Sequence, residues 1–170
     1  MSAPGRPKRH TAARSAKREG CLMTAPRCTD PRVARVVVFF EQISPADLPR
    51  IGELYATDAR FKDPFNEVQG VAAITAVFEH MYRMLDAPRF VVRDCVAEGD
   101  QCFLTWDFAF RFKRFSPAVD QVVHGASHLR FAADGRIALH RDYWDAAEEL
   151  YEKLPAVGAL MRWLKRRANA

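Results

Sequence analysis

The first half of the chain shows apolar residues at helical spacing. One helix face is predicted by residues at i, i+3, i+4 and i+7: Val33, Val36, Val37 and Phe40. Residues 44–47 (Ser-Pro-Ala-Asp) have the composition of a helix start, with serine as N-cap and proline at N1. The helix that they begin is expected to carry one apolar stripe: Leu48, Ile51, Leu54 and Tyr55. A third amphipathic helix is predicted over residues 71–85 and is expected to stop at Pro88.

After Pro88 the apolar spacing changes to alternation, which is typical of β-strands. Turns at 98–100 and 133–135 separate the strands predicted at 89–97, 101–114, 120–132 and 136–144. The second strand places on one face Leu104, Trp106, Phe108, Phe110 and Phe112. The third places Val123, Gly125, Ser127, Leu129 and Phe131 on one face and His124, His128 and Arg130 on the other. A short extended segment at 59–63 precedes the third helix.

The order of these elements predicts an α+β domain. Three N-terminal helices are followed by a four-stranded antiparallel meander and then by closing helices at 146–152 and 156–167. Helices collected on one face of a strongly curved sheet form a cone that encloses a pocket, where ligands usually bind. We expect three regions: a disordered tail at 1–30, one domain at 31–150 and a C-terminal helical extension at 151–170.

The net charge of +5 is concentrated in the tail. Residues 1–27 hold seven Lys or Arg against Glu19 alone, so the remaining 143 residues are close to neutral. A basic segment with few apolar residues is expected to be disordered. It is interpreted as a solvated extension or as the result of a misassigned start with Met23 as the true first residue; a nucleic-acid arm and an organelle presequence stay open as alternatives. The near-neutral domain at 31–150 is not expected to bind nucleic acid.

The four cysteines do not suggest a metal site or a disulfide framework. Cys21, Cys28, Cys95 and Cys102 form no CxxC pair and have no histidine at matching spacing. They are interpreted as buried or free thiols in a reducing compartment, which favours a cytoplasmic location. The apolar runs are too short to span a bilayer.

Two segments far apart in the sequence combine carboxylates with aromatic residues. Asp63 precedes a proline at the end of the short extended segment, and Asp142 lies in the cluster Asp-Tyr-Trp-Asp at 142–145. If the two segments meet, they surround one pocket. Asp63 has a structural alternative, because an Asp before Pro often bonds the backbone N–H groups of its own turn.

The orientation of Asp142 depends on the alternation along its strand. If Ile137 and Leu139 lie in the core, strict alternation turns Asp142 outward, where a salt bridge to Arg141 or Arg93 is expected. The opposite choice places His140, Asp142 and Trp144 together in the pocket, and we expect this one. His140 is then either a base held by a carboxylate or a hydrogen-bonded structural residue.

The order of elements at 31–150 resembles the nuclear transport factor 2-like superfamily, which includes ketosteroid isomerase, limonene epoxide hydrolase, SnoaL-type polyketide cyclases and non-catalytic binding proteins. The resemblance to ketosteroid isomerase implies that Asp63 is the general base. Phe39 takes the place of that enzyme's oxyanion-hole tyrosine, and Ser127 takes the place of its protonated aspartate. Because one oxyanion donor is lost and the other is weakened, efficient steroid isomerisation is not expected.

The cyclase and epoxide hydrolase branches place a working aspartate on a late strand, and the resemblance implies Asp142 for this role. The full Asp-Arg-Asp relay of the hydrolases cannot be matched, although Arg111 and Arg141 are possible members, and this disfavours hydrolysis of epoxides. The SnoaL-like branch is the one that the chain resembles best.

These arguments predict a site with two catalytic carboxylates, Asp63 and Asp142. The expected substrate-binding residues are Tyr55, Trp106, Phe108, Ser127, His140 and Trp144. Tyr55 either donates a hydrogen bond into the cavity or packs on a helix face with its hydroxyl at the rim.

Two functions stay open. One is an isomerase or cyclase that works without a cofactor on an apolar oxygenated molecule (a polyketide, terpenoid or steroid-like compound) by carboxylate acid/base chemistry. The other is a non-catalytic ligand-binding or dimerisation domain of the same fold. The resemblance also implies a homodimer through the outer sheet face, which carries Thr105, Asp107, His124, His128 and Arg130.

Overall fold

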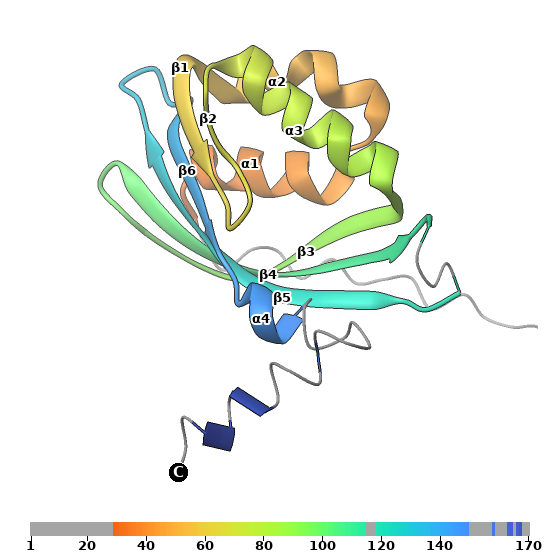
Figure 1. The fold of residues 1–170 in the computed structure, drawn as a ribbon. Helices are drawn as coiled ribbons and strands as arrows, with labels where there is room; N and C mark the ends of the chain where they lie inside the picture. Colours follow the sequence, from red (N-terminus) through yellow and green to blue (C-terminus); the bar gives the residue numbers. More distant parts are fainter. Residues whose placement is uncertain (1–28, 115–117, 150–157, 159–162, 165, 168–170) are drawn as a thin grey trace, which may run out of the picture.

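A computed structural model describes residues 29–114, 118–149, 158, 163–164 and 166–167 of the chain. Six strands form one curved sheet in the order β2-β1-β6-β5-β4-β3, and helices α1 and α3 lie over its concave face (Figure 1). The predicted α+β class is confirmed. The strands are β1 (Tyr55–Lys62), β2 (Glu67–Gln69), β3 (Leu85–Glu98), β4 (Gln101–Phe112), β5 (Gln121–Phe131) and β6 (Ile137–Tyr143).

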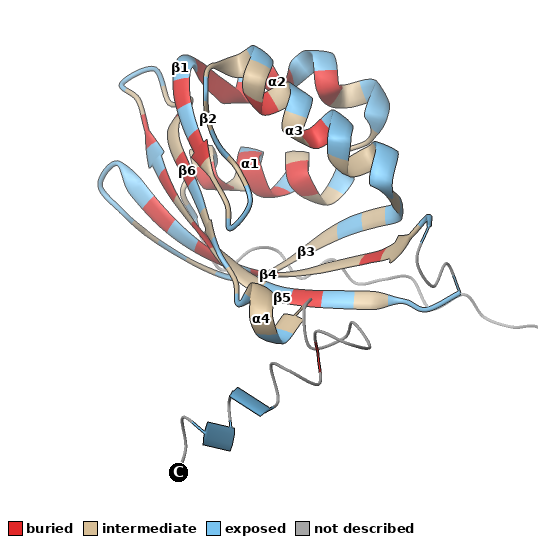
Figure 2. Ribbon diagram, viewed as in Figure 1, coloured by how far each residue is buried: buried red, intermediate tan, exposed pale blue. Residues whose placement is uncertain are grey.

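The first helix, α1 (Pro31–Gln42), forms where the apolar spacing predicts it. The Asp30 side chain caps its N-terminus by accepting a hydrogen bond from the Arg32 backbone N–H at 2.8 Å, with Pro31 in the first turn. The four apolar residues of the predicted face are all buried against the sheet. Figure 2 shows buried stretches in α1, in α3 and in the strands of the sheet.

The second predicted helix is shorter than expected. Ser44 and Asp47 form a capping box, in which the Asp47 carboxylate accepts hydrogen bonds from the backbone N–H and hydroxyl of Ser44. A 3₁₀-helix η1 (Pro45–Arg50) follows, and only the single turn α2 (Ile51–Leu54) is α-helical. Tyr55 was placed on this helix by the sequence analysis, and that placement is wrong: it is the first residue of β1 and is completely buried.

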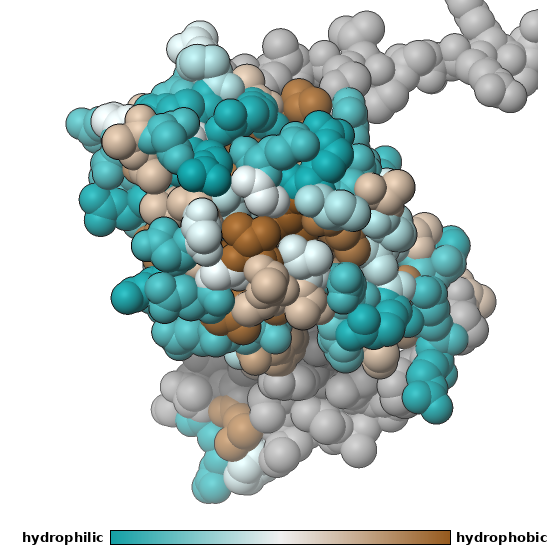
Figure 3. All heavy atoms as spheres, turned by 90° about the horizontal axis from the view of Figure 1, so that it is seen from above, coloured by the Kyte–Doolittle hydropathy of each residue, from teal (hydrophilic) through white to brown (hydrophobic). Residues whose placement is uncertain are grey.

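The third helix, α3 (Val71–Met84), ends before Pro88 is reached. Strand β3 begins directly at Leu85, and its pairing with β4 skips between Asp86 and Arg89. Pro88 lies inside this irregularity, where a residue without an N–H donor is tolerated in a strand. The expectation that Pro88 stops the helix is therefore wrong. Seen from the side of α2 and α3, the surface is mostly hydrophilic around a central group of apolar side chains (Figure 3).

The antiparallel meander of β3, β4, β5 and β6 has the predicted order. The apolar face of β4 points to the core, with Leu104, Trp106 and Phe110 buried. Trp106 pairs directly with Gly125 of β5, and a Cβ atom at this glycine would lie 2.3 Å from the indole. The glycine is needed because the indole lies flat over the neighbouring strand.

Strand β6 carries an irregularity that decides the orientation of Asp142. Phe131 of β5 pairs with Ile137, but the preceding residue Arg130 pairs with Leu139, so Ala138 is an extra residue. Such a bulge shifts the alternation by one position. Ile137 and His140 are consequently both buried, and Asp142 lines the interior cavities.

Strand β1 extends the sheet by pairing parallel to β6 and antiparallel to β2. Neither β2 nor the parallel pair was predicted from the sequence, in which only a short segment at 59–63 read as extended. The pairing of β1 with β6 has a register shift between Tyr55 and Arg60, so the first half of β1 is not regularly paired.

The ends of the chain lie mainly outside the described residues. The predicted tail at 1–30 is described only at residues 29 and 30, and the predicted extension at 151–170 only at a few positions. Helix α4 (Ala146–Glu149) is the described part of the first closing helix, and residues 158, 163–164 and 166–167 within the second are helical. Among the described residues, no helix has the length and apolar character to cross a membrane.

Candidate functional site

The parallel pair of β1 and β6 brings the two acidic segments together. Because the strands run in the same direction, with Lys62 opposite Arg141, their carboxyl ends meet at one edge of the sheet. Asp63 follows β1, and Asp142 and Trp144 lie at the end of β6. All three line one cavity, so the expected meeting of the two segments occurs.

Tyr55 and His140 form the inner part of a buried polar network. The Tyr55 hydroxyl lies 2.5 Å from His140 Nδ1, and the two rings are nearly parallel. Burial, and secondarily the negative charge of Asp142, raise the pKa of Tyr55 well above its usual range. The phenol therefore stays protonated, and its O–H can donate a hydrogen bond to Nδ1. Phe61 packs its ring edge-on against the imidazole at 5.0 Å between centroids, which fixes the ring plane.

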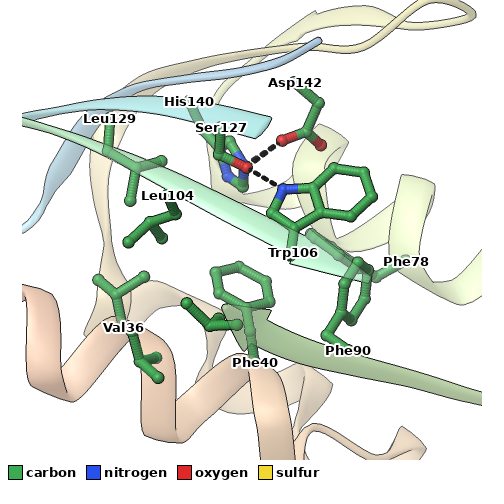
Figure 4. Close-up of a pocket in the computed structure, with 12 residues that line it drawn as sticks. Val36, Phe40, Phe78, Phe90, Leu104, Trp106, Ser127, Leu129, His140 and Asp142 are labelled. Carbon is green, nitrogen blue, oxygen red and sulfur yellow. Dashed lines mark hydrogen bonds and ion pairs between the residues drawn. The ribbon is translucent and has the colours of Figure 1, made fainter. Parts of the chain in front are cut away.

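Asp142 receives two hydrogen bonds on one oxygen. Its Oδ1 lies 2.8 Å from His140 Nε2 and 2.5 Å from the Ser127 hydroxyl oxygen. Ser127 in turn accepts a hydrogen bond from the Trp106 indole Nε1–H at 2.8 Å. Figure 4 shows the Ser127 hydroxyl between the indole and the carboxylate.

The protons of this network can be assigned from donor chemistry. An indole N–H can only donate a hydrogen bond, so the Ser127 oxygen accepts one from Trp106. The Ser127 hydroxyl then donates a hydrogen bond to Asp142. Since His140 Nδ1 accepts from Tyr55, its proton is on Nε2 and is donated to Asp142. Both donations reach Oδ1. Among the described residues, Oδ2 of Asp142 has no hydrogen-bond partner, although the side chain is only 17% exposed.

Two interior cavities and one open depression meet at Asp142, and the depression is also lined by Lys62, Asp63, Arg141 and Trp144. The inner one has a volume of about 30 Å³ and lies between α1 and the sheet (Figure 4). The outer one has a volume of about 310 Å³, which is in the range of small-molecule sites. Four residues belong to the walls of both: Phe78, Phe90, Trp106 and Asp142.

The outer cavity is lined mainly by aromatic and aliphatic side chains. Trp106, Phe108 and Trp144 are part of its wall, as the sequence analysis expects. Further wall residues were missed: Phe61, Phe65, Asn66, His80, Met84, Phe90 and Val123. His80 lies on α3 but is not one of the residues of its predicted apolar face, and it is exposed. The apolar spacing therefore did not indicate it as a cavity residue. Tyr55 is outside the lining of both cavities and acts on the site only through His140.

Asp63 lies at the outer part of this cavity and is held by its own turn. Its Oδ1 accepts hydrogen bonds from the backbone N–H groups of Phe65 and Asn66 at 2.7 and 2.6 Å. The Asn66 side-chain amide contacts both carboxylate oxygens, at 3.0 and 2.9 Å. This is the turn arrangement that the sequence analysis kept as the structural alternative.

The outer sheet face carries the polar residues predicted there. Asp107 forms an ion pair with Arg93 and lies 2.7 Å from His124 Nδ1, so Arg93 is not available to Asp142. His128 stacks on Phe103 with 4.4 Å between ring centroids. Arg130 pairs with Asp100.

The arrangement combines a held carboxylate with a mainly apolar, partly open cavity. A carboxylate with one free oxygen in such a place can accept a proton from a bound molecule, provided that the reacting atom reaches hydrogen-bonding distance. Within the described part of the chain, no group of His, Cys, Asp and Glu has the geometry to hold a metal ion.

Comparisons with known proteins agree with the fold. The model of the SnoaL-like domain matches residues 36–140, ending two residues before Asp142. No curated protein sequence matches the chain significantly. Several solved structures are similar at low sequence identity, which supports likeness of fold alone.

Three of these structures illustrate the range. A hypothetical protein with a ketosteroid isomerase-like fold from Catenulispora acidiphila, in complex with trimethylamine, has a TM-score of 0.62 and 18% identity, covering 72% of this chain and 92% of its own. A putative SnoaL-like polyketide cyclase from Jannaschia has a TM-score of 0.60 and 17% identity, covering 69% and 87%. A putative isomerase of the SnoaL-like family from Agrobacterium tumefaciens has a TM-score of 0.55 and 20% identity, covering 67% and 94%.

Proposed function

The chain belongs to the SnoaL-like domain family, and we propose that it is an isomerase or cyclase in which Asp142 transfers a proton on an apolar, oxygenated small molecule. Similar structures are described as a putative isomerase and a putative polyketide cyclase, which supports this class of reaction. The substrate is bound in the aromatic cavity of about 310 Å³.

The observation that carries the proposal is the one-sided hydrogen bonding of Asp142. Its Oδ1 is held by Ser127 and His140, while Oδ2 has no partner among the described residues. Two fixed donors orient the carboxylate, and the cavity on this side of it is mainly apolar. Orientation of this kind lowers the barrier because the base does not have to be positioned during the reaction.

The proposed step is the removal of a proton from carbon next to a carbonyl group. The proton moves to Oδ2 of Asp142, the C–H electron pair forms a C=C bond, and the carbonyl oxygen takes the negative charge of an enolate. Return of the proton to another carbon completes an isomerisation. In a cyclisation the enolate carbon attacks a second carbonyl of the same molecule, and the alkoxide that forms takes the proton back from Asp142. His80, which lines the same cavity, is the group that we assign to hydrogen-bond the substrate oxygen.

Asp142 is a better base than Asp63 for geometric reasons. The carboxylate of Asp63 has four hydrogen-bond contacts within its own turn, about as many as a carboxylate has lone-pair positions. Asp142 has two such contacts, both on Oδ1. We therefore assign proton transfer to Asp142 and give Asp63 a role in shaping the cavity entrance.

A non-catalytic binding protein of the same fold is the second candidate. It would use the same cavity without proton transfer. The observation in its favour is the full hydrogen bonding of Asp63, because the cavity then offers one carboxylate for chemistry and not the two that the sequence analysis expects.

We also propose a homodimer through the outer sheet face. Val96 and Phe103 form a cross-strand pair there, and they are 71% and 49% exposed. Phe103 also pairs with His128 of β5, so a polar residue borders the apolar pair. Sedimentation analysis of the wild type and of Phe103→Lys tests this proposal; a wild-type monomer would refute it.

The experiment for the proposed function is a ligand screen by thermal unfolding. Small apolar ketones, including β-diketones and polyketide fragments, are added to the wild type, to Asp142→Asn and to Asp63→Asn. A ligand at a hundred times its Kd adds about 2.7 kcal/mol to the stability, which is readily seen. Ketones that bind then serve as test substrates for isomerisation and cyclisation. Binding without turnover of any bound ketone would favour the second candidate, and no binding by any ketone would contradict both.

A further inference from the structure

Two aromatic rings form a corner at the entrance of the outer cavity. Phe65 and Trp144 pack edge to face, with ring centroids 5.3 Å apart and ring planes at 74°. Both line the cavity, and Phe65 is 54% exposed although it is a large apolar residue. The corner therefore presents aromatic surface that the fold of the described residues does not cover.

A carboxylate that forms no ion pair with a described Lys or Arg lies beside this corner. Asp63 lines the same cavity, and its hydrogen bonds all come from neutral donors, the backbone of Phe65 and Asn66 and the Asn66 amide. Among the described residues, no Lys or Arg forms an ion pair with Asp63. The nearest basic side chains are engaged elsewhere, because Lys62 pairs with Glu67 and the Arg141 guanidinium lies over the Tyr143 ring.

The cavity lining has a second acidic residue besides Asp63. Its ionisable residues are Asp63, Asp142 and His80, with no Lys or Arg among them. Lys62 and Arg141 line the open depression next to this cavity, together with Asp63 and Asp142. Inside the cavity an anionic ligand would meet the two carboxylates, which disfavours carboxylates and phosphates there. A cation, in contrast, would meet aromatic faces and a negative charge together.

Perpendicular aromatic rings beside a carboxylate are a known chemical solution for binding alkylated ammonium groups, since the ring faces attract the cation. The hydrogen-bond acceptors of Asp63 are already occupied by its turn, so the carboxylate has little capacity left for N–H donors. A primary ammonium needs such acceptors, whereas a quaternary ammonium needs only charge and aromatic contact. This difference favours a methylated ammonium group.

We propose that Asp63, Phe65 and Trp144 form a recognition site for the tertiary or quaternary ammonium group of a small molecule whose apolar part enters the cavity toward Asp142. The inference rests on the proposed function, because it describes the other end of the molecule on which Asp142 acts. It assigns to Asp63 a role in substrate selection in place of proton transfer.

The test compares two probes of the same shape. Choline carries a trimethylammonium group, and 3,3-dimethylbutan-1-ol carries a neutral tert-butyl group in its place. Titrations followed by ligand-observed NMR measure the affinity of each for the wild type, Asp63→Asn and Phe65→Leu. Asp63→Asn keeps the oxygen that accepts the turn hydrogen bonds and removes the charge. Asp58→Asn is the matched control, because Asp58 is an exposed acid on β1, the strand that ends just before Asp63.

The wild type is expected to bind choline at least about 5-fold more tightly than the alcohol, as a cation–π contact with charge support implies. Asp63→Asn and Phe65→Leu are each expected to weaken choline binding about 3- to 10-fold without weakening the alcohol, while Asp58→Asn leaves both unchanged. Equal or tighter binding of the alcohol, no binding of choline, or an equal loss for both probes in Asp63→Asn would overturn the ammonium site. If neutral ketones still bind and react in an Asp142-dependent manner, the proposed function survives that result.

Discussion

Tyr55 and His140 are 85 residues apart in the sequence and form a 2.5 Å hydrogen bond in the interior of the domain. The bond joins the first residue of β1 to the buried face of β6 and fixes which imidazole nitrogen carries the proton. His140 then donates from Nε2 to Asp142 at 2.8 Å. Tyr55 thus positions the carboxylate without touching the cavity.

Removing the Tyr55 hydroxyl tests this chain of hydrogen bonds. Tyr55→Phe leaves Nδ1 of His140 without its donor, and a buried polar atom without a partner typically costs about 1–3 kcal/mol. We expect a loss of stability in this range by urea unfolding. Imidazole ¹⁵N chemical shifts should show the Nε2–H tautomer in the wild type and a mixture in Tyr55→Phe. An Nδ1–H tautomer in the wild type would contradict the proton assignment.

Gly125 is expected to be essential for the position of the Trp106 indole. In Gly125→Ala the new methyl group would lie 2.3 Å from the ring, so the indole must shift and its hydrogen bond to Ser127 is strained. Overpacking of this kind costs about 1–3 kcal/mol, measured as the free energy of unfolding in urea. Gly52→Ala is the matched control, because its Cβ would meet Val71 at an ordinary 3.6 Å and an alanine favours the helical turn. Equal effects of the two substitutions would refute the explanation.

The turn role of Asp63 predicts a difference between two substitutions. Asp63→Ala removes all acceptors of the turn and is expected to lower the stability by about 1–2 kcal/mol. Asp63→Asn keeps one oxygen acceptor for the backbone N–H groups of Phe65 and Asn66 and should cost clearly less. Chemical unfolding of both variants measures this difference. Equal losses would show that charge, and not the turn, determines the role of Asp63.

The N-terminal cap of α1 predicts a pH dependence at low pH. The hydrogen bond from the Arg32 side chain, followed by backbone hydrogen bonding, lowers the pKa of Asp30 from 3.8 to about 2. A lowered pKa means that the folded state favours the ionised form. The stabilisation is therefore complete above about pH 4 and is lost as the pH falls toward about 2.

We expect the free energy of unfolding of the wild type to fall more steeply between pH 4 and pH 2 than that of Asp30→Asn. At pH 7 the free energies of unfolding of the wild type and Asp30→Asn should differ by at most about 1 kcal/mol, because the ion pair of Asp30 and Arg32 is partly exposed. Asp58→Asn serves as the control for loss of one acidic group. Parallel pH profiles of the wild type and Asp30→Asn would refute the assigned role of the cap.

The helices and the meander could be predicted from the sequence because their apolar spacing is regular over many residues. The four buried residues of α1 and the alternating face of β4 are clear examples. The same regularity, with the resemblance, leads to the family that the comparisons show. Local rules fail where a backbone irregularity intervenes: Pro88 lies in a break of the β3–β4 pairing, and η1 replaces an α-helix over six residues.

The residues of the candidate site could be predicted from the sequence better than their arrangement in space. Ser127, His140 and Asp142 could be named from the sequence, and the structure joins them by hydrogen bonds. The extra residue Ala138, which turns His140 and Asp142 to the same interior as Ile137, has no signal in the alternation. The parallel pairing of β1 with β6, which brings Asp63 near Trp144, is a long-range contact that no local pattern encodes.

The central claim is that Asp142 removes a proton from a bound ketone, and hydrogen–deuterium exchange at the ligand measures this step directly. A ketone that stabilises the wild type is incubated with the protein in D₂O, and loss of its α-proton signal is followed by NMR. The wild type should catalyse exchange, Asp142→Asn should lower the rate by about 10²–10⁴-fold as expected for loss of a general base, and Asp63→Asn should stay close to the wild type. Exchange that persists in Asp142→Asn, or that is lost in Asp63→Asn alone, would contradict the account.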